Sequence, residues 1–178
     1  NAPFLVFDDA DIDAAVQGAV ISKYRNAGQT CVCTNRFYVQ SGAYAEFVAK
    51  LTAEVEKLKV GNGMEDGVQV GPLIDDKAIQ KVQQHLDDAV AKGAKLLTGG
   101  KPHQLGGTFF QPTVVSEVTQ DMLICREETF GPLAGVVRFD TEEEGVALAN
   151  DTIFGLAGYF YSRDISRVNN DHIRHGFG

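Results

Sequence analysis

Short apolar runs alternate along the chain with longer stretches in which apolar residues recur every three or four positions. The short runs have the length and composition of buried strands, and the longer stretches have the period of amphipathic helices. Such an alternation is typical of a mainly parallel sheet whose faces are covered by helices. We therefore predict an α/β fold of three layers, with a mainly parallel open sheet and helices on both of its faces.

The predicted strands are short and rich in apolar residues, and they comprise 3–7, 36–40, 94–98, 109–115, 133–139 and 155–161. The first predicted helix begins after Asp9 or Asp11, either of which can cap it, and ends near Gly28. The other predicted helices comprise 43–59, 75–92 and 141–150. Neither an internal repeat nor a break in composition divides the chain, so we expect one domain over residues 1–178.

The composition is that of an ordinary globular domain: 178 residues, of which 44% are hydrophobic and 22% charged. Sixteen Lys and Arg against 24 Asp and Glu give a net charge of −8 without a basic block, which makes nucleic acid a poor partner. The apolar runs are far shorter than the ~20 residues that span a bilayer, so we expect no membrane insertion. An odd number of cysteines and the lack of a leader pattern favour a reducing, cytoplasmic setting.

Candidate chemistry is concentrated in residues 25–33. Cys31 lies in the short connection between a predicted helix and a predicted strand, where a side chain can project into a cleft. A thiolate there would attack a carbonyl carbon well, and positive charge from Arg25 would help the thiol to ionise. Composition alone favours the alternative, in which Cys31 and Cys33 are small buried residues.

Two segments of the sequence favour the catalytic interpretation of Cys31 over the structural one. The first, Gly28-Gln29-Thr30-Cys31, resembles the active-site signature of the aldehyde dehydrogenase superfamily, and Glu127-Glu128-Thr129-Phe130-Gly131-Pro132 resembles its second signature. The resemblance covers nearly the whole chain. Within the superfamily it is greatest to the succinate-semialdehyde dehydrogenase branch, because Arg25 precedes the nucleophile by six residues and Cys33 follows it by two.

The resemblance implies a complete reaction. Cys31 would attack an aldehyde to form a thiohemiacetal, hydride would pass to NAD or NADP, and water would hydrolyse the remaining thioester to a carboxylate. Glu128 would hold the hydroxyls of the nicotinamide ribose, and Phe130 would position the nicotinamide ring. Considered from the residues alone, the favoured interpretation is that Glu128 is a solvated loop carboxylate and that Phe130 is a core aromatic residue; the paired signature segments reverse this preference.

Arg25 has two interpretations. An arginine at a helix end commonly caps the helix dipole in solvent. Alternatively, its planar guanidinium binds a carboxylate through two hydrogen bonds and fixes the far end of an ω-oxo acid. The resemblance implies the second role, with a small carboxylated aldehyde such as succinate semialdehyde as substrate; glutarate semialdehyde is the nearest alternative.

The remaining cysteines and histidines carry weaker signals. Cys33 could form a disulfide with Cys31 on oxidation, or it could be a passive thiol. A noncatalytic redox or metal-binding module built on Cys31 and Cys33 is the alternative from another functional class. We interpret Cys125 as structural. Only His172 and His175 have a helical ligand spacing, and we propose no metal site.

The resemblance also implies what the chain lacks. The general-base Glu of the family would precede Asn1, the cofactor-binding domain would lie further upstream, and residues 169–178 do not continue the family's pattern. We therefore expect a nucleophile-bearing catalytic domain that is truncated at both ends and has negligible turnover alone. Its parent enzyme is expected to be a homo-oligomer, either a dimer or a tetramer.

Overall fold

The structure is a computed structural model that describes residues 1–170. Its centre is a six-stranded sheet with the strand order β3-β4-β5-β2-β1-β6. All neighbouring strands are parallel except β3, which is antiparallel to β4. The strands are β1 (Ala2–Val6), β2 (Thr34–Gln40), β3 (Lys95–Thr98), β4 (Thr113–Val118), β5 (Leu133–Phe139) and β6 (Tyr159–Tyr161).

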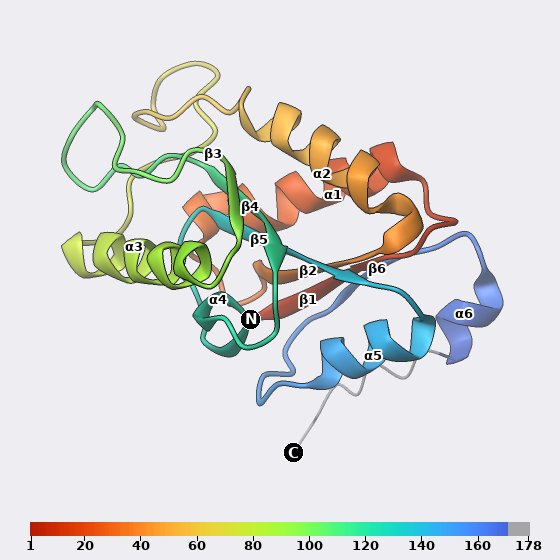
Figure 1. The fold of residues 1–178 in the computed structure, drawn as a ribbon. Helices are drawn as coiled ribbons and strands as arrows, with labels where there is room; N and C mark the ends of the chain where they lie inside the picture. The colour runs from red at the N-terminus through yellow and green to blue at the C-terminus, as the bar shows by residue number, and fades with distance from the viewer. Residues whose placement is uncertain (171–178) are drawn as a thin grey trace.

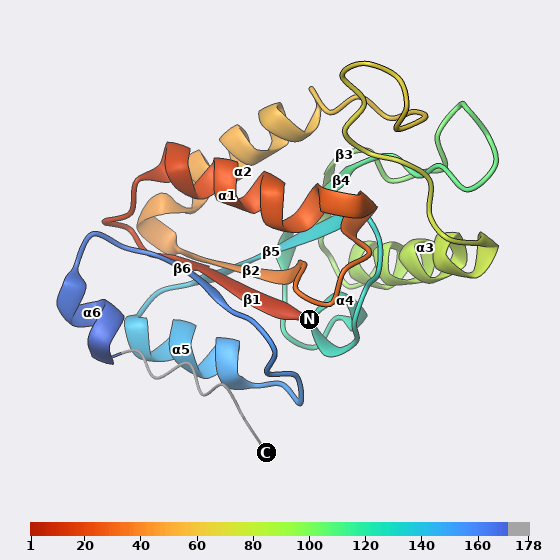
Figure 2. The same ribbon diagram turned by 180° about the vertical axis from the view of Figure 1, so that it is seen from behind.

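Helices cover both faces of this sheet. They are α1 (Ile12–Tyr24), α2 (Ser41–Val55), α3 (Asp76–Ala91), α4 (Leu123–Arg126), α5 (Glu142–Asn150) and α6 (Ile165–Asn170). In Figures 1 and 2, α1 and α2 lie together on one face of the sheet, and α4 and α5 lie on the other. The predicted fold, a mainly parallel open sheet between two layers of helices, is therefore confirmed.

Side-chain caps and apolar faces explain where the main helices form. Asp11 accepts a hydrogen bond from the Ala14 amide at the start of α1, and Asp75 accepts one from the Ala78 amide at the start of α3. The strands β1, β2, β4 and β5 carry fully buried aromatic and aliphatic residues, and α2 buries the side chains of Phe47 and Leu51 against the sheet. None of the helices within residues 1–170 is both long and apolar enough to cross a membrane.

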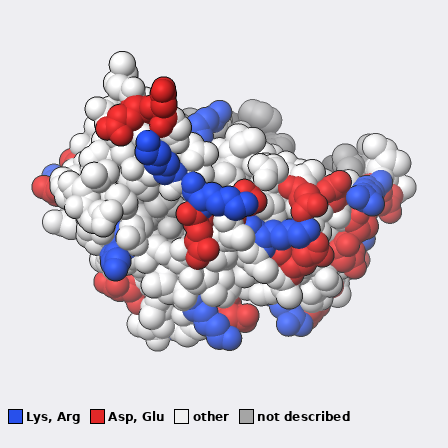
Figure 3. Space-filling model, turned by 90° about the horizontal axis from the view of Figure 1, so that it is seen from above, with Lys and Arg blue, Asp and Glu red and all other residues white. Residues whose placement is uncertain are grey.

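The charged surface is mixed in sign. Figure 3 shows acidic and basic side chains interspersed on the face seen from above, which includes α2. On α2, Lys50 lies between two carboxylates, 2.6 Å from Asp13 Oδ1 of α1 and 2.7 Å from Glu46 Oε1. The pair with Asp13 links the two helices, whereas the pair with Glu46 lies within α2, and each exposed pair contributes at most a small stabilisation.

Several element boundaries differ from prediction. The strand predicted at 109–115 forms instead at Thr113–Val118, because residues 109–111 pair with residues 101–103 in a loop. The strand predicted at 155–161 is confined to Tyr159–Tyr161, and α2 ends at Val55 rather than at residue 59. Helices α4 and α6 were not predicted. Residues 171–178, with His172 and His175, lie outside the described residues.

Candidate active site

Cys31 and Cys33 are held with opposite exposure in the turn between α1 and β2. The Cys31 side chain is exposed, whereas Cys33 is only 1% exposed. The sulfur of Cys33 lies 2.8 Å from the Thr30 hydroxyl and 3.8 Å from the carbonyl oxygen of Arg25. The hydroxyl of Tyr159 on β6 donates a 2.8 Å hydrogen bond to the carbonyl of Val32. This turn is therefore anchored on both sides of Cys31, while Cys31 itself faces outward.

The two signature segments meet through their glycines. After α1, a short 3-10 turn (Arg25–Gly28) has Asn26, Ala27 and Gly28 in the left-handed region, with Gly28 at φ 77°. A Cβ atom on Gly28 would lie 2.1 Å from the carbonyl oxygen of Gly131. The backbone of the first segment therefore packs directly on the backbone of the second, close to Cys31 in the chain.

Gln29 connects the same turn to a third segment. Its side-chain amide donates to the carbonyl of Pro72 at 3.3 Å, and its side-chain oxygen accepts from the Ile74 amide at 2.8 Å. A cavity of about 610 Å³ opens there, lined by Asn26, Gln29, Pro72, Leu73, Ile74 and Phe130. Sequence reasoning missed the loop at 72–74, for which the Gly71-Pro72 turn was the only signal.

The second signature segment directs some of its side chains toward α3 and others toward Asn1 and the cavity. Glu128 Oε1 lies 2.7 Å from the backbone nitrogen of Asn1, and Phe130 is 39% exposed at the wall of the cavity. In contrast, Glu127 pairs with Lys81 of α3, and this hydrogen bond lowers the pKa of the Glu127 carboxyl. The structure therefore directs Glu128 and Phe130 away from the contacts that Glu127 makes with α3.

Lys23 is a charged residue of the site that sequence reasoning missed. Its position in the last turn of α1 indicates an exposed helix-capping cation, yet the side chain is fully buried. Its ammonium group donates to Asn35 Oδ1 at 3.3 Å. Burial lowers the pKa of Lys23 to about 8, and the facing Cys33 and Glu128 partly oppose this shift.

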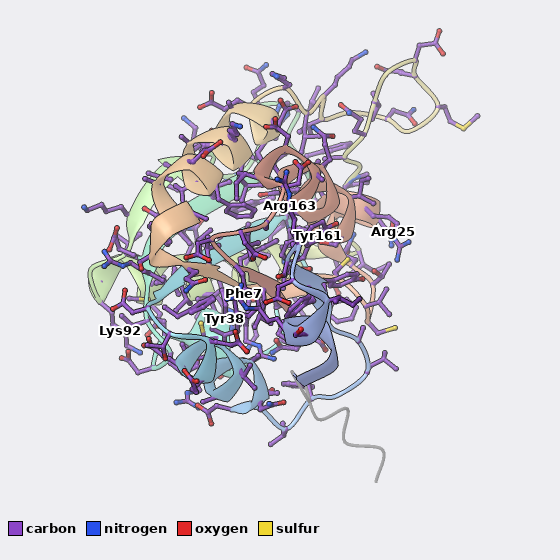
Figure 4. The ribbon with its side chains drawn as sticks, turned by 90° about the vertical axis from the view of Figure 1, so that its right-hand side faces the viewer. Phe7, Arg25, Tyr38, Lys92, Tyr161 and Arg163 are labelled. Atoms are coloured by element: carbon purple, nitrogen blue, oxygen red, sulfur yellow. The ribbon has the colours of Figure 1, made fainter. Side chains whose placement is uncertain are left out.

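Arg25 is exposed at the end of α1, and Figure 4 shows its side chain directed outward at the edge of the molecule. By contrast, the same view places Phe7 and Tyr38 within the fold. Within residues 1–170, no hydrogen bond or ion pair engages the Arg25 guanidinium. The structure thus leaves this cation free to bind an anion, and its predicted role in substrate binding remains a prediction.

Cys125 occupies a different environment from Cys31. It is buried on α4, and burial raises the pKa of its thiol to about 12. Such a thiol is largely unionised at neutral pH, as expected for a structural cysteine. Among the described residues, no group of three or more His, Cys, Asp or Glu side chains is placed to hold a metal ion.

Comparisons with known proteins agree on one family. A sequence model described as "Aldehyde dehydrogenase family" matches residues 1–174. The chain is 64% identical over 168 residues to a glutarate-semialdehyde dehydrogenase of Pseudomonas aeruginosa, and 58% identical over 168 residues to an NADP(+) succinate-semialdehyde dehydrogenase of Escherichia coli strain K12. Each alignment covers 94% of this chain but 35% of the relative.

A solved structure gives the same result. The crystal structure of succinate-semialdehyde dehydrogenase from Burkholderia pseudomallei matches with a TM-score of 0.95 and 62% identity. The match covers 96% of this chain and 36% of that one. The chain thus spans about a third of the length of the relatives it matches.

Proposed function

Because the chain belongs to the aldehyde dehydrogenase family, we propose that residues 1–178 form the nucleophile-bearing catalytic domain of an NAD(P)-dependent dehydrogenase for a short carboxylated aldehyde. Succinate semialdehyde is the first candidate substrate. The observation that carries this proposal is the contact of the two signature segments at Gly28 and Gly131, beside an exposed Cys31. If the two signature segments served unrelated functions, their backbones would not need to be in contact.

Cys31 is the nucleophile in this proposal. Its thiolate adds to the carbonyl carbon of the aldehyde, and the carbonyl oxygen becomes the oxyanion of a thiohemiacetal. No described hydrogen bond uses the Cys31 amide, so its N–H is free to donate to that oxyanion. Cys31 then leaves as a thiol when water cleaves the thioester that oxidation produces.

The second segment fits a nicotinamide cofactor. Phe130 presents a partly exposed ring at the cavity wall, and such a ring can pack on a planar heterocycle. The side chain of Glu128 is 30% exposed, and its carboxylate can accept hydrogen bonds from ribose hydroxyls. When bound, NAD or NADP supplies the hydride acceptor of the reaction.

The substrate proposal depends on Arg25. Its exposed guanidinium, which has no partner among residues 1–170, can bind the carboxylate of an ω-oxo acid through two hydrogen bonds. The names of two relatives, for succinate semialdehyde and glutarate semialdehyde, both denote acid aldehydes and support this class of substrate. Glutarate semialdehyde therefore remains the alternative to succinate semialdehyde.

The test is Arg25→Ala in a full-length enzyme that contains this chain. Loss of a charge-assisted contact should raise KM for succinate semialdehyde roughly ten- to a hundredfold and leave KM for an uncharged aldehyde of similar length nearly unchanged. Arg25→Lys, which keeps the charge but loses the two-pronged geometry, should give an intermediate KM. Equal losses on both substrates would contradict the assignment.

Cys33 is the candidate partner in a redox switch. Peroxide would oxidise Cys31 to a sulfenic acid, and the Cys33 thiol would then condense with it, forming the disulfide and releasing water. Cys33 would have to leave its contacts with Thr30 and Arg25 to do so. Mass mapping after peroxide treatment tests this prediction, and Cys31 oxidised without a bond to Cys33 would reject it.

A further inference from the structure

The segment from Glu127 to Phe130 directs alternate residues to opposite sides. Glu127 has extended backbone angles, φ −118° and ψ 155°, and successive side chains of an extended chain point in opposite directions. Glu127 and Thr129 contact α3, whereas Glu128 reaches the Asn1 nitrogen and Phe130 lines the cavity. The contacts that fix Glu127 and Thr129 therefore also set the direction in which the side chains of Glu128 and Phe130 point.

One face of α3 fixes the first pair. Lys81 pairs with Glu127, and His85 Nδ1 lies 2.7 Å from the Thr129 hydroxyl, with both His85 and Thr129 fully buried. A Cβ atom on Gly131 would lie 2.2 Å from the side chain of Val82, so α3 is in direct contact with the segment. These contacts recur at helical spacing along α3, at positions 81, 82 and 85.

The surroundings of His85 favour one tautomer. Its Nε2 is buried without a hydrogen-bond partner and lies 3.4 Å from Glu127 Oε2. A carboxylate repels a nitrogen lone pair, so the proton belongs on Nε2, and Nδ1 then accepts from the Thr129 O–H. Burial and the charge of Lys81 lower the pKa of His85, against the opposing effects of Glu127 and Asp88. The neutral ring thus contacts both residues that flank Glu128.

From this geometry we infer that His85 is a positioning residue, which holds Thr129 and Glu127 so that Glu128 and Phe130 face the cofactor. The inference rests on the proposed function, in which Glu128 and Phe130 bind the nicotinamide nucleoside. His85 itself touches neither substrate nor cofactor in this account. Its effect should therefore be confined to dinucleotide binding and should not extend to the reactivity of Cys31.

The first test needs no enzymatic activity. Nitrogen-15 NMR of the 178-residue chain should show the His85 proton on Nε2, and the pKa of the ring should lie below its ordinary value. Thr129→Val removes the hydroxyl at nearly constant volume and should shift the signals of Glu128 and Phe130. Thr129→Ser should restore most of that shift, and the matched control Thr52→Val on α2 should cause none. A proton on Nδ1, or unmoved Phe130 signals in Thr129→Val, would overturn the inference.

The second test uses a full-length enzyme that contains this chain. Thr129→Val and His85→Leu should each raise KM for NAD(P)+ roughly tenfold or more, as misplaced binding groups do. KM for the aldehyde and the alkylation rate of Cys31 should stay close to wild type, and Thr129→Ser should recover most of the loss. An unchanged KM for NAD(P)+, or an equal rise in both KM values, would overturn the inference.

The two tests also separate this inference from the proposed function. A wild-type enzyme that oxidises no carboxylated aldehyde would refute the proposed function, while the NMR experiment would still decide whether His85 orients Glu128 and Phe130. Conversely, an active wild-type enzyme with normal cofactor binding in both variants would refute only the role of His85.

Discussion

Gly28 is placed where two independent constraints exclude a side chain. Its φ of 77° lies in the left-handed region, and a Cβ atom would meet the carbonyl oxygen of Gly131 at 2.1 Å. The first constraint was predictable, because glycine commonly ends a helix in this conformation. The second was not, since the approach of two segments distant in sequence leaves no trace in the local pattern. The burial of Lys23 likewise depends on packing between distant segments, so the local sequence pattern did not indicate it.

Gly28→Ala should therefore destabilise the chain by about 1–3 kcal/mol or more, through backbone strain and the clash with Gly131. Urea denaturation measures the change. Gly63→Ala is the matched control, because a Cβ atom there meets nothing within 4 Å, and its effect should stay within about 0.5 kcal/mol. Equal stabilities of the two variants would contradict the described contact between the signature segments.

Lys23 should make stability depend on pH in a definite direction. Burial lowers its folded pKa to about 8, below the ordinary 10.5, so between these values the unfolded chain holds the proton more tightly. Its contribution to stability therefore rises with pH across this window, and below pH 8 the fold bears the cost of burying the charge.

Replacing Lys23 by Met should stabilise the chain at pH 7 by at most about 3 kcal/mol, because the cost of burying the charge is removed. The loss of the donor to Asn35 Oδ1 offsets part of this gain. This advantage over wild type should shrink as the pH rises toward 10. Denaturation midpoints at several pH values provide the measurement, with exposed Lys57→Met as control. An advantage that does not vary with pH would show that Lys23 is not buried as described.

At the scale of elements, the sequence predicted long regular segments better than short ones. The strand at Leu133–Phe139 has the predicted bounds, and α3 differs from prediction by one residue at each end. The strand β4 was displaced because its end, Ser116-Glu117-Val118, is too polar to stand out, and its fit depends on pairing with β5. Four-residue α4 is too short for a periodic pattern.

The cap of α3 offers a test at this scale, since α3 supports the second signature segment. Asp75→Ala removes the acceptor of the 2.8 Å bond from the Ala78 amide and should cost about 0.5–2 kcal/mol. Amide exchange in the first turn of α3 should quicken accordingly. Asp76→Ala, at the neighbouring position without this bond, should have a smaller effect; the reverse order would contradict the assigned helix start.

At the scale of the whole molecule, three segments far apart in sequence converge at one cavity. The turn before β2 supplies Gln29, the loop before α3 supplies Ile74, and the segment before β5 supplies Phe130. The order of elements predicted an α/β sheet, on which sites commonly gather at the carboxyl ends of the strands. The cavity lies instead at the amino ends of β2 and β5, because Gln29 and Phe130 precede these strands. Which loops meet there depends on tertiary packing, and the sequence indicated only the two signature segments.

The proposed function requires that Cys31 be a reactive thiol aimed at an aldehyde. Limited alkylation of the chain with iodoacetamide, followed by mass mapping of all three cysteines, tests this most directly. We predict that Cys31 reacts much faster than Cys33 and Cys125, and that succinate semialdehyde protects it. Cys31 labelled no faster than Cys33, or protection of both thiols by zinc but not by the aldehyde, would contradict the account.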